Sequence, residues 1–193
     1  MNDTSTDMQL FLQCVENTYG KFEQLSDDEV KKWVPLNSDN IGTGPRNLWI
    51  DVFGVFNFVT LHQNTRNYKY LRLAGQLVRR VHHVLGRMKD RTSRLPGATD
   101  KEPYKGGLRL GHNGRQDRYT GTLQVHSALK MWIFTLNLLS PQADEFRELN
   151  LLVIKLAKAV QPIFVDKDHI GTYSIHPAIY TTANRTIKEI RAK

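Results

Sequence analysis

The sequence predicts an all-α fold made of antiparallel helical hairpins. Apolar residues recur at helical spacing through most of the chain, and no segment alternates apolar and polar residues as a strand does. The predicted helices also alternate between those that are apolar on one side and those that are apolar nearly all round. The connections between them alternate in the same way between long and short, which is the pattern of stacked hairpins.

The first predicted helix spans residues 8–25, and Asp7 is placed to cap it. It is a one-sided amphipathic helix. A short turn then runs from Ser26 through Trp33, and residues 35–45 are predicted to be loop because of their prolines and glycines. The apolar side of the helix consists of Phe11, Val15, Tyr19 and Phe22.

The second predicted helix, residues 47–63, is apolar in almost every direction, so we expect it to be buried on most sides. Asp51 is the exception, because it lies among large apolar residues where a carboxylate is costly unless it is paired. Two interpretations follow. Asp51 is either a general acid or base whose pKa is raised by burial, or a structural acid held by Arg46 or a loop amide.

A tight turn at residues 64–67 leads into a third helix from Tyr68 to about Met88, apolar on one side only. A long segment rich in Gly, Pro, Arg and Asp follows at residues 89–119. The fourth helix, residues 120–139, is again apolar nearly all round, although it includes Gln124 and His126. Loops as long as the 89–119 segment are usually functional or disordered.

Ser140 and Pro141 end the fourth helix, and they are predicted to cap and begin a one-sided fifth helix that continues to about Gln161. A loop at residues 162–177 and a short final helix complete the chain. The simplest arrangement places helices two, four and six inside and helices one, three and five outside, with an irregular bundle as the alternative. All long loops then emerge at one end, where they form a rim.

This rim collects the polar residues that interrupt the apolar helices. Asn47 and Asp51 begin the second helix, Gln124 and His126 begin the fourth, and the 89–119 and 166–176 loops lie between. Amides, acids and aromatic faces are the groups that bind sugar hydroxyls and rings, and acids serve in proton transfer. We therefore expect a pocket for a saccharide-like or other polyhydroxylated ligand at the rim.

The net charge of +8, from 27 Lys and Arg against 19 Asp and Glu, makes binding of a polyanion a third hypothesis. Two basic clusters stand out. The first is interpreted as the solvated face of the third helix: Arg79, Arg80, His82, His83 and Arg87. The second lies in the Gly-rich loop, where it serves either solubility or the gripping of an anionic or hydroxyl-rich ligand: Lys101, Lys105, Arg109, His112, Arg115 and Arg118.

The remaining composition favours a single cytoplasmic domain without a metal or other cofactor. No apolar run is long enough to cross a membrane, and the polar, acidic N-terminus does not resemble a signal peptide. Cys14 lies beside Phe11 and Val15, so we expect a buried, inert thiol. The histidines show no metal-ligand spacing, since His82 and His83 are adjacent and diverge on a helix.

Four segments resemble a family of largely uncharacterised fungal and bacterial proteins with a six-hairpin glycosidase-like fold. They are GTGPRNLWIDVFGVFNF at 42–58, SRLPGATD at 93–100, GGLRLG at 106–111 and WIFTLNLLS at 132–140. The similarity covers about residues 5–160, the N-terminal half of such a protein. It implies an α/α toroid of twelve helices with a pocket at the long-loop end.

The chain departs from this family in two respects. Relatives open the fourth helix with Asp-Gly-Gln-Tyr-His-His-Tyr, whereas residues 122–128 here retain only Gln124 and His126 of that run. Six predicted helices also make only three hairpins, half of a toroid. Half a toroid exposes the apolar flanks of its inner helices, so we expect either a homodimer that closes the ring or a truncated, non-catalytic relative.

The expected site follows from these considerations. If the protein is an enzyme, hydrolysis or elimination at a glycosidic bond is the first class to test, with Asp51 and either Asp100 or Asp117 as the acid and base. The alternative is a non-catalytic half-toroid that acts as an interaction module, and nucleic acid is the least favoured partner. The expected ligand-binding residues are Arg46, Asn47, Trp49, Arg109, Gln124 and His126. The alternative for Arg46 and Arg109 is that they hold loop carbonyls, and the alternative for His126 is a structural position in the core.

Overall fold

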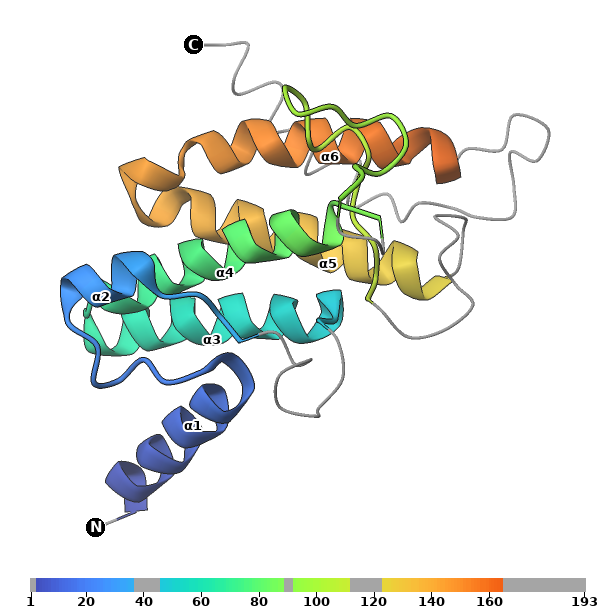
Figure 1. The fold of residues 1–193 in the computed structure, drawn as a ribbon. Helices are drawn as coiled ribbons and strands as arrows, with labels where there is room; N and C mark the ends of the chain where they lie inside the picture. The colour runs from blue at the N-terminus through green and yellow to red at the C-terminus, as the bar shows by residue number, and fades with distance from the viewer. Residues whose placement is uncertain (1–2, 37–45, 89–91, 112–122, 165–193) are drawn as a thin grey trace.

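A computed structural model describes residues 3–36, 46–88, 92–111 and 123–164, and in these ranges the chain is helical (Figure 1). These ranges contain no strand, only an isolated antiparallel bridge between Arg87 and Arg94. The prediction of an all-α protein is confirmed. The helices are α1 (Asp3–Tyr19), α2 (Asp27–Lys32), α3 (Leu48–Thr65), α4 (Lys69–Leu85), α5 (Leu123–Leu139) and α6 (Glu148–Phe164), with short 3₁₀ helices η2 (Ser140–Gln142) and η3 (Asp144–Phe146).

Two antiparallel hairpins, α3–α4 and α5–α6, make the body of the molecule. Helix α3 packs against both α4 and α5, while α2 covers part of α4. In Figure 1, α3 and α5 run in the same direction and α4 and α6 return. The N-termini of α3 and α5 therefore lie at the end of the body where α4 ends, as the alternation of long and short connections predicts.

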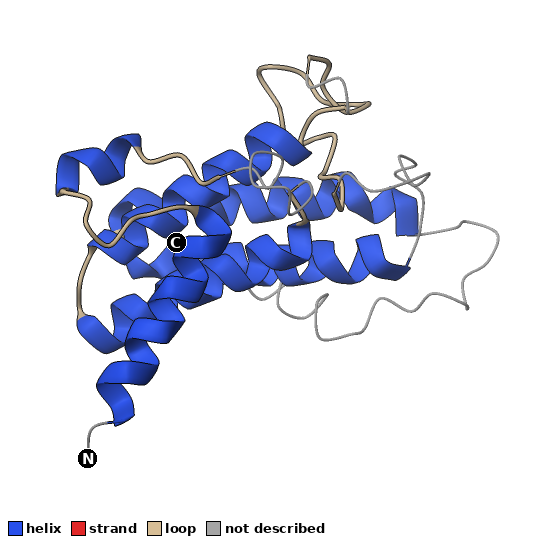
Figure 2. Ribbon diagram, turned by 60° about the horizontal axis from the view of Figure 1, so that its bottom comes forward, coloured by secondary structure: helices blue, strands red, loops and turns tan. Residues whose placement is uncertain are grey.

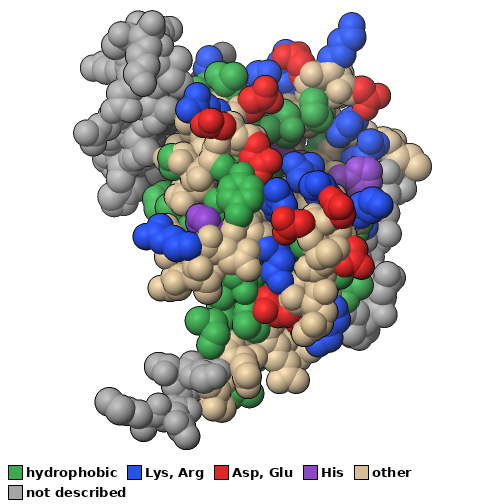
Figure 3. Space-filling view, turned by 90° about the vertical axis from the view of Figure 1, so that its left-hand side faces the viewer, with side chains coloured by type: hydrophobic (Ala, Val, Ile, Leu, Met, Phe, Trp, Pro, Cys, Tyr) green, Lys and Arg blue, Asp and Glu red, His purple; other side chains and the backbone are tan. Residues whose placement is uncertain are grey.

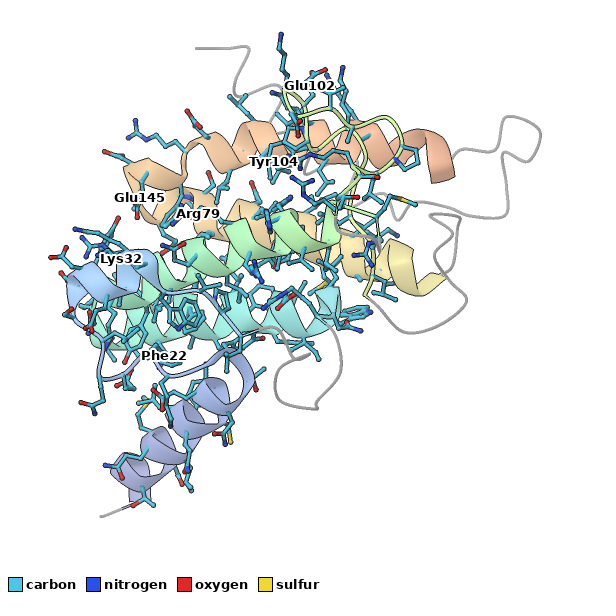
Figure 4. All side chains as sticks on the ribbon, in the orientation of Figure 1. Phe22, Lys32, Arg79, Glu102, Tyr104 and Glu145 are labelled. Carbon is cyan, nitrogen blue, oxygen red and sulfur yellow. The ribbon has the colours of Figure 1, made fainter. Side chains whose placement is uncertain are left out.

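The core lies between these helices and follows the apolar periodicity of the sequence. Helix α4 buries one side of its surface, as predicted, but α3 is not buried on most sides, because Ile50 and Phe53 are exposed. Aromatic residues from four segments meet in this core, where the ring of Phe22 packs edge-on against Trp33, Phe58 and Tyr70. Figure 4 labels Phe22. The largest fully buried side chains are Trp132, Phe22, Phe58, Leu48, Leu71, Leu73, Leu77, Leu85, Leu108, Leu136, Leu139 and Leu156.

Helix α1 contacts the body only through its last turns and extends away from it (Figures 1 and 2). Tyr19 is buried, and its hydroxyl donates a 2.6 Å hydrogen bond to the carbonyl of Ile50. Gly54 permits this approach, because a Cβ there would lie 2.4 Å from the Tyr19 hydroxyl. The expectation of a buried Cys14 is wrong: the thiol is exposed, although Val15 beside it is buried in the core.

Helix α1 ends at Tyr19, before the predicted end at residue 25. Gly20 adopts a left-handed conformation with φ of 97°, and this ends the helix. The carboxylate of Glu16 then accepts hydrogen bonds from the backbone N–H groups of Phe22 and Glu23, both at 2.9 Å. Phe22 therefore lies in the turn after α1 and is buried there, although its spacing in the sequence predicts that it lies on the helix.

The segment after α5 also differs from the prediction. Ser140 and Pro141 begin a 3₁₀ helix, and a second one follows before α6 starts at Glu148. Phe146 in η3 explains this detour, because its buried ring packs against Gly75 of α4, where a Cβ would lie 2.8 Å from the ring. The predicted final helix lies outside the described residues.

Candidate functional site

The most unusual polar group of the core is an ion pair at the beginning of α3. Nη1 of Arg46 lies 2.5 Å from Oδ1 of Asp51, and the two side chains are only 3% and 2% exposed. Nη2 of Arg46 also donates to the carbonyl of Leu36 at 2.8 Å. Arg46 therefore ties the segment before α3 to the first turn of the helix.

The pair is only partly satisfied. Oδ2 of Asp51 and Nε of Arg46 are buried, and neither has a hydrogen-bond partner among the described residues. Burial raises the pKa of Asp51 to about 7, and the charge and hydrogen bond of Arg46 offset only part of that rise. The carboxyl group therefore has the acidity of a general acid or base but lies inside the fold.

Asn47 and Trp49 stabilise the same helix start. The side chain of Asn47 caps α3 by accepting a 2.9 Å hydrogen bond from the backbone N–H of Trp49, and the Trp49 ring is half-buried against the core. The N–H of Leu48 donates to the carbonyl of Leu110 at 2.7 Å, and Gly111 packs directly against the backbone of residues 46–47. The end of the Gly-rich segment thus lies against the beginning of α3.

Arg109 is buried and is used as a cap for the C-terminus of α4. Its guanidinium donates to the carbonyls of Arg87 at 2.5 Å, Val84 at 3.1 Å and Gly111 at 3.3 Å. Its own N–H donates to the carbonyl of Leu85 at 2.9 Å. The helix end and a cation are electrostatically complementary, so these contacts explain the burial of Arg109 without a ligand.

Asp100 differs from Asp51 in both exposure and partner. Its side chain is 87% exposed and accepts from Nε of Arg94 at 3.0 Å. Within the described residues, no hydrogen bond or ion pair connects Asp100 to Asp51. Asp117 lies outside those residues. The backbones of Gln124 and His126 belong to the first turn of α5, and their side chains are also outside the described part.

The structure thus brings together Arg46, Asn47 and Asp51 at the beginning of α3, beside residues 109–111. Their hydrogen bonds among the described residues are with one another and with the backbone, which suits a structural role. The assignment of Asp51, Asp100 and Asp117 as acid and base remains a prediction.

Sequence reasoning missed a partly buried histidine that contacts the core. The interpretation of His82 as part of a solvated face is wrong, because Nε1 of Trp132 donates to its Nε2 at 3.1 Å and the Tyr104 ring packs edge-on against it (Figure 4). Burial lowers the pKa of His82 to about 3, so the ring is neutral. The periodicity of α4 contained the signal, since His82 follows Val78 by four residues and Val78 is buried.

Sequence reasoning did anticipate an apolar flank on the inner helices, and one is present. Ile50 and Phe53 of α3 are 50% and 56% exposed, and Phe134 of α5 is 54% exposed. Phe56 links them, with ring centroids 6.4 Å from Phe53 and 6.1 Å from Phe134. We name Ile50, Phe53, Phe56 and Phe134 the α3/α5 apolar face.

Metal binding and membrane crossing find no support in the described ranges. No group of three or more His, Cys, Asp and Glu side chains there is arranged to hold a metal ion. Likewise, none of the described helices has both the length and the hydropathy to cross a membrane.

Comparisons of the chain with protein-family models, with curated proteins and with solved structures gave no match.

Proposed function

We propose that this protein is a helical interaction module that assembles with a second copy of itself through the α3/α5 apolar face. The observation that carries the proposal is the chain of three phenylalanine rings from α3 to α5, two of them more than half exposed. Contiguous exposed apolar patches are typical of interaction sites. Aromatic side chains also contribute much of the binding energy at interfaces.

The charge distribution favours a second copy as the partner. Each chain has a net charge of +8, so two copies repel wherever their basic surfaces meet. Helix α3 contains no Lys or Arg, and its one carboxylate, Asp51, is buried and paired. A two-fold contact places this uncharged helix against itself, and it therefore brings the chains together where repulsion is smallest.

The direction of the helices supports a specific geometry for the pair. Helices α3 and α5 are parallel neighbours, each with an antiparallel helix behind it, as the inner helices of an α/α toroid are. We propose that the described hairpins form part of a half-toroid and that the second copy supplies the facing half. Burying a fully exposed Phe side chain contributes about 1.5–3 kcal/mol, and Phe53 and Phe134 of both copies are a little more than half exposed, so their burial contributes to association.

The molar mass in solution tests the proposal. Light scattering on the full chain should give a dimer of twice 22.2 kDa. The double variant Phe53→Gln/Phe134→Gln should give a folded monomer, because both large side chains of the face are lost. A matched control, Val34→Gln/Leu151→Gln, removes two residues that are 60% and 56% exposed elsewhere, and it should remain a dimer.

Two results would contradict the proposal. One is a wild-type protein that is monomeric and folded at every concentration measured. The other is a dimer that survives in Phe53→Gln/Phe134→Gln and dissociates in the control, since the interface would then lie elsewhere on the molecule.

A saccharide-binding enzyme is the second candidate. Its specific support is Asp51, whose pKa is raised to about 7 and whose Oδ2 has no partner among the described residues. Hydrolysis of a glycosidic substrate that is lost in Asp51→Asn, with the helical circular dichroism retained, would favour this candidate. Unchanged turnover in that variant would remove Asp51 from the mechanism.

A further inference from the structure

Four cationic or titratable side chains converge where α4 ends and the next segment turns back. Arg80 and His83 lie on α4, and Arg87 follows it directly. Arg94 is brought back to Arg87 by the isolated antiparallel bridge, supported by a 2.9 Å hydrogen bond from the N–H of Met88 to the carbonyl of Ser93. We name Arg80, His83, Arg87 and Arg94 the α4-end basic cluster.

The four groups are close enough to affect one another electrostatically. The pKa of His83 is lowered, first by burial and then by the charges of Arg80, Arg87 and Arg94. His83 itself is exposed to solvent. Three guanidinium groups from two segments are therefore near enough to one accessible imidazole to lower its pKa.

This arrangement has an unfavourable element that an anion would relieve. Residues facing each other across an antiparallel bridge have adjacent side chains, and like charges placed directly opposite are destabilising. Arg87 uses Nη1 to donate to the carbonyl of Thr92 at 2.8 Å, while its buried Nε has no hydrogen-bond partner. The structure thus holds like charges together and leaves a guanidinium donor unused.

Two acidic groups, Asp100 and Glu148, lie near the cluster. Among the described residues, Asp100 pairs with Nε of Arg94, but its side chain is 87% exposed, so the pair is weak and easily exchanged for another anion. Burial raises the pKa of Tyr104, the charge of Arg94 lowers it, and the charge of Glu148 on α6 raises it, so both charged groups lie near that ring. By contrast, basic and acidic side chains are interspersed on the face of the molecule drawn in Figure 3.

We propose that the α4-end basic cluster binds a compact phosphate dianion, such as the phosphate group of a small phosphomonoester. Arginine guanidinium groups match tetrahedral oxoanions by paired hydrogen bonds, and His83 supplies a further donor when protonated. Arg87 and Arg94 face each other across the bridge, so guanidinium groups from two segments come together at one place. A single phosphate group therefore fits better than the extended backbone of a nucleic acid, which needs a basic groove along the strand.

Inorganic phosphate is the first probe, titrated into the full chain at constant ionic strength with chloride as the balancing anion. NMR of the histidine ring protons should show the pKa of His83 rising by about 1, because a bound dianion favours the imidazolium form. His62, which lies near the other end of the α3–α4 hairpin, is the internal control and should not respond. Glycerol phosphate should produce the same effect as inorganic phosphate.

Variants then locate the site. Arg94→Gln should weaken phosphate binding at least about tenfold, as expected for loss of a charge-assisted pair. The control Lys32→Gln removes one equally positive, exposed charge on α2 and should change the affinity less than about twofold. His83→Gln tests the site separately in case Arg94→Gln does not fold, since His83 is exposed and has no role in the bridge.

Three results would overturn the proposal. The first is no response of His83 to phosphate beyond that to chloride. The second is equal loss of affinity in Arg94→Gln and Lys32→Gln, which indicates general attraction to a basic protein. The third is tight binding of a short single-stranded oligonucleotide that depends on Arg94 while phosphate and glycerol phosphate do not bind, since the ligand would then be a polymer.

Discussion

At the scale of single residues, the buried charges of this protein connect segments. Arg46 joins the segment before α3 to Asp51, and Arg109 gathers the carbonyls at the end of α4. Both guanidinium groups donate hydrogen bonds to backbone carbonyls for which the irregular connections provide no backbone N–H partner. Such residues are as sensitive to substitution as catalytic residues, although their effect is on stability.

The Arg46–Asp51 pair predicts a pH dependence of stability. The pKa of Asp51 is about 7 in the folded protein and near 3.8 when unfolded, so the folded state binds the proton more tightly. Between about pH 3.8 and pH 7, the contribution of Asp51 to the free energy of unfolding must therefore fall as the pH rises, by up to about 1.4 kcal/mol per pH unit. Asp51→Asn has no proton to lose and should lack this component.

Urea unfolding of both proteins at several pH values between 5 and 8 measures this effect. The free energy of unfolding of the wild type, relative to Asp51→Asn, should decrease by about 2 kcal/mol from pH 5 to pH 7. Because all other titrating groups are shared, they cancel in the difference. Parallel curves between pH 5 and 8 would show that Asp51 is ionised throughout this range, and they would contradict a raised pKa.

The sequence predicted the burial of Asp51 and named Arg46 as its alternative partner, since an acid among apolar residues five positions from an arginine has few other solutions. It did not distinguish that role from catalysis, because both begin with a buried carboxylate. It failed for Cys14 and His82 for a common reason. Helical spacing assigns a residue to a side of its helix, but only the neighbouring helices decide which sides are covered.

At the scale of elements, the attachment of α1 depends on one close approach. A Cβ added to Gly54 would lie 2.4 Å from the Tyr19 hydroxyl and 2.7 Å from Cδ2 of Leu77. Both neighbours are buried, so neither has room to move. Helix α3 therefore needs a glycine where α1 crosses it on one side and α4 on the other.

Gly54→Ala should consequently destabilise the protein by about 1–3 kcal/mol, in spite of the higher helix propensity of alanine. Thermal or urea unfolding measures the loss. Thr60→Ala is a suitable control, because Thr60 is exposed on the same helix, and it should change the stability by less than about 0.5 kcal/mol. If Gly54→Ala were as stable as the wild type, α1 would not pack against α3 as the structure has it.

The element boundaries show where sequence patterns were sufficient. The predicted starts and ends of α3, α4 and α5 lie within about three residues of those observed, since strong periodicity is interrupted by clear turns. The end of α1 and the start of α6 were less accurate. Phe22 and Phe146 have helical spacing in the sequence, yet they lie outside α1 and α6 and are buried there. Both contact α4, and the local sequence does not encode these contacts.

At the scale of the whole molecule, the alternation of helix types predicted the packing of neighbours better than it predicted the site. It correctly paired α3 with α4 and α5 with α6, because short connections leave few other arrangements. It also predicted an uncovered flank on α3 and α5, from the number of hairpins. What it could not predict is the use of the polar groups at the helix starts, which depends on side-chain contacts such as those of Arg109.

The extended first helix gives a last prediction about assembly. Met8, Leu10 and Phe11 are 39%, 55% and 37% exposed on α1, and α1 leaves the body beside Ile50 of the α3/α5 apolar face. In the proposed dimer this helix extends the apolar surface available to the partner. The triple variant Met8→Gln/Leu10→Gln/Phe11→Gln should therefore weaken the dimer by about tenfold or more, the equivalent of about 1.4 kcal/mol.

Sedimentation equilibrium over a range of concentrations measures that change, with Gln9→Ala/Gln13→Ala as the control on the same exposed helix. The monomer should stay folded in both, because Val15, Tyr19 and Phe22 still anchor the segment to the core. Weaker association in the triple variant only would show that α1 takes part in the contact. Unchanged association would confine the interface to α3 and α5, since a helix that touches the partner cannot exchange three apolar side chains for amides without loss of binding energy.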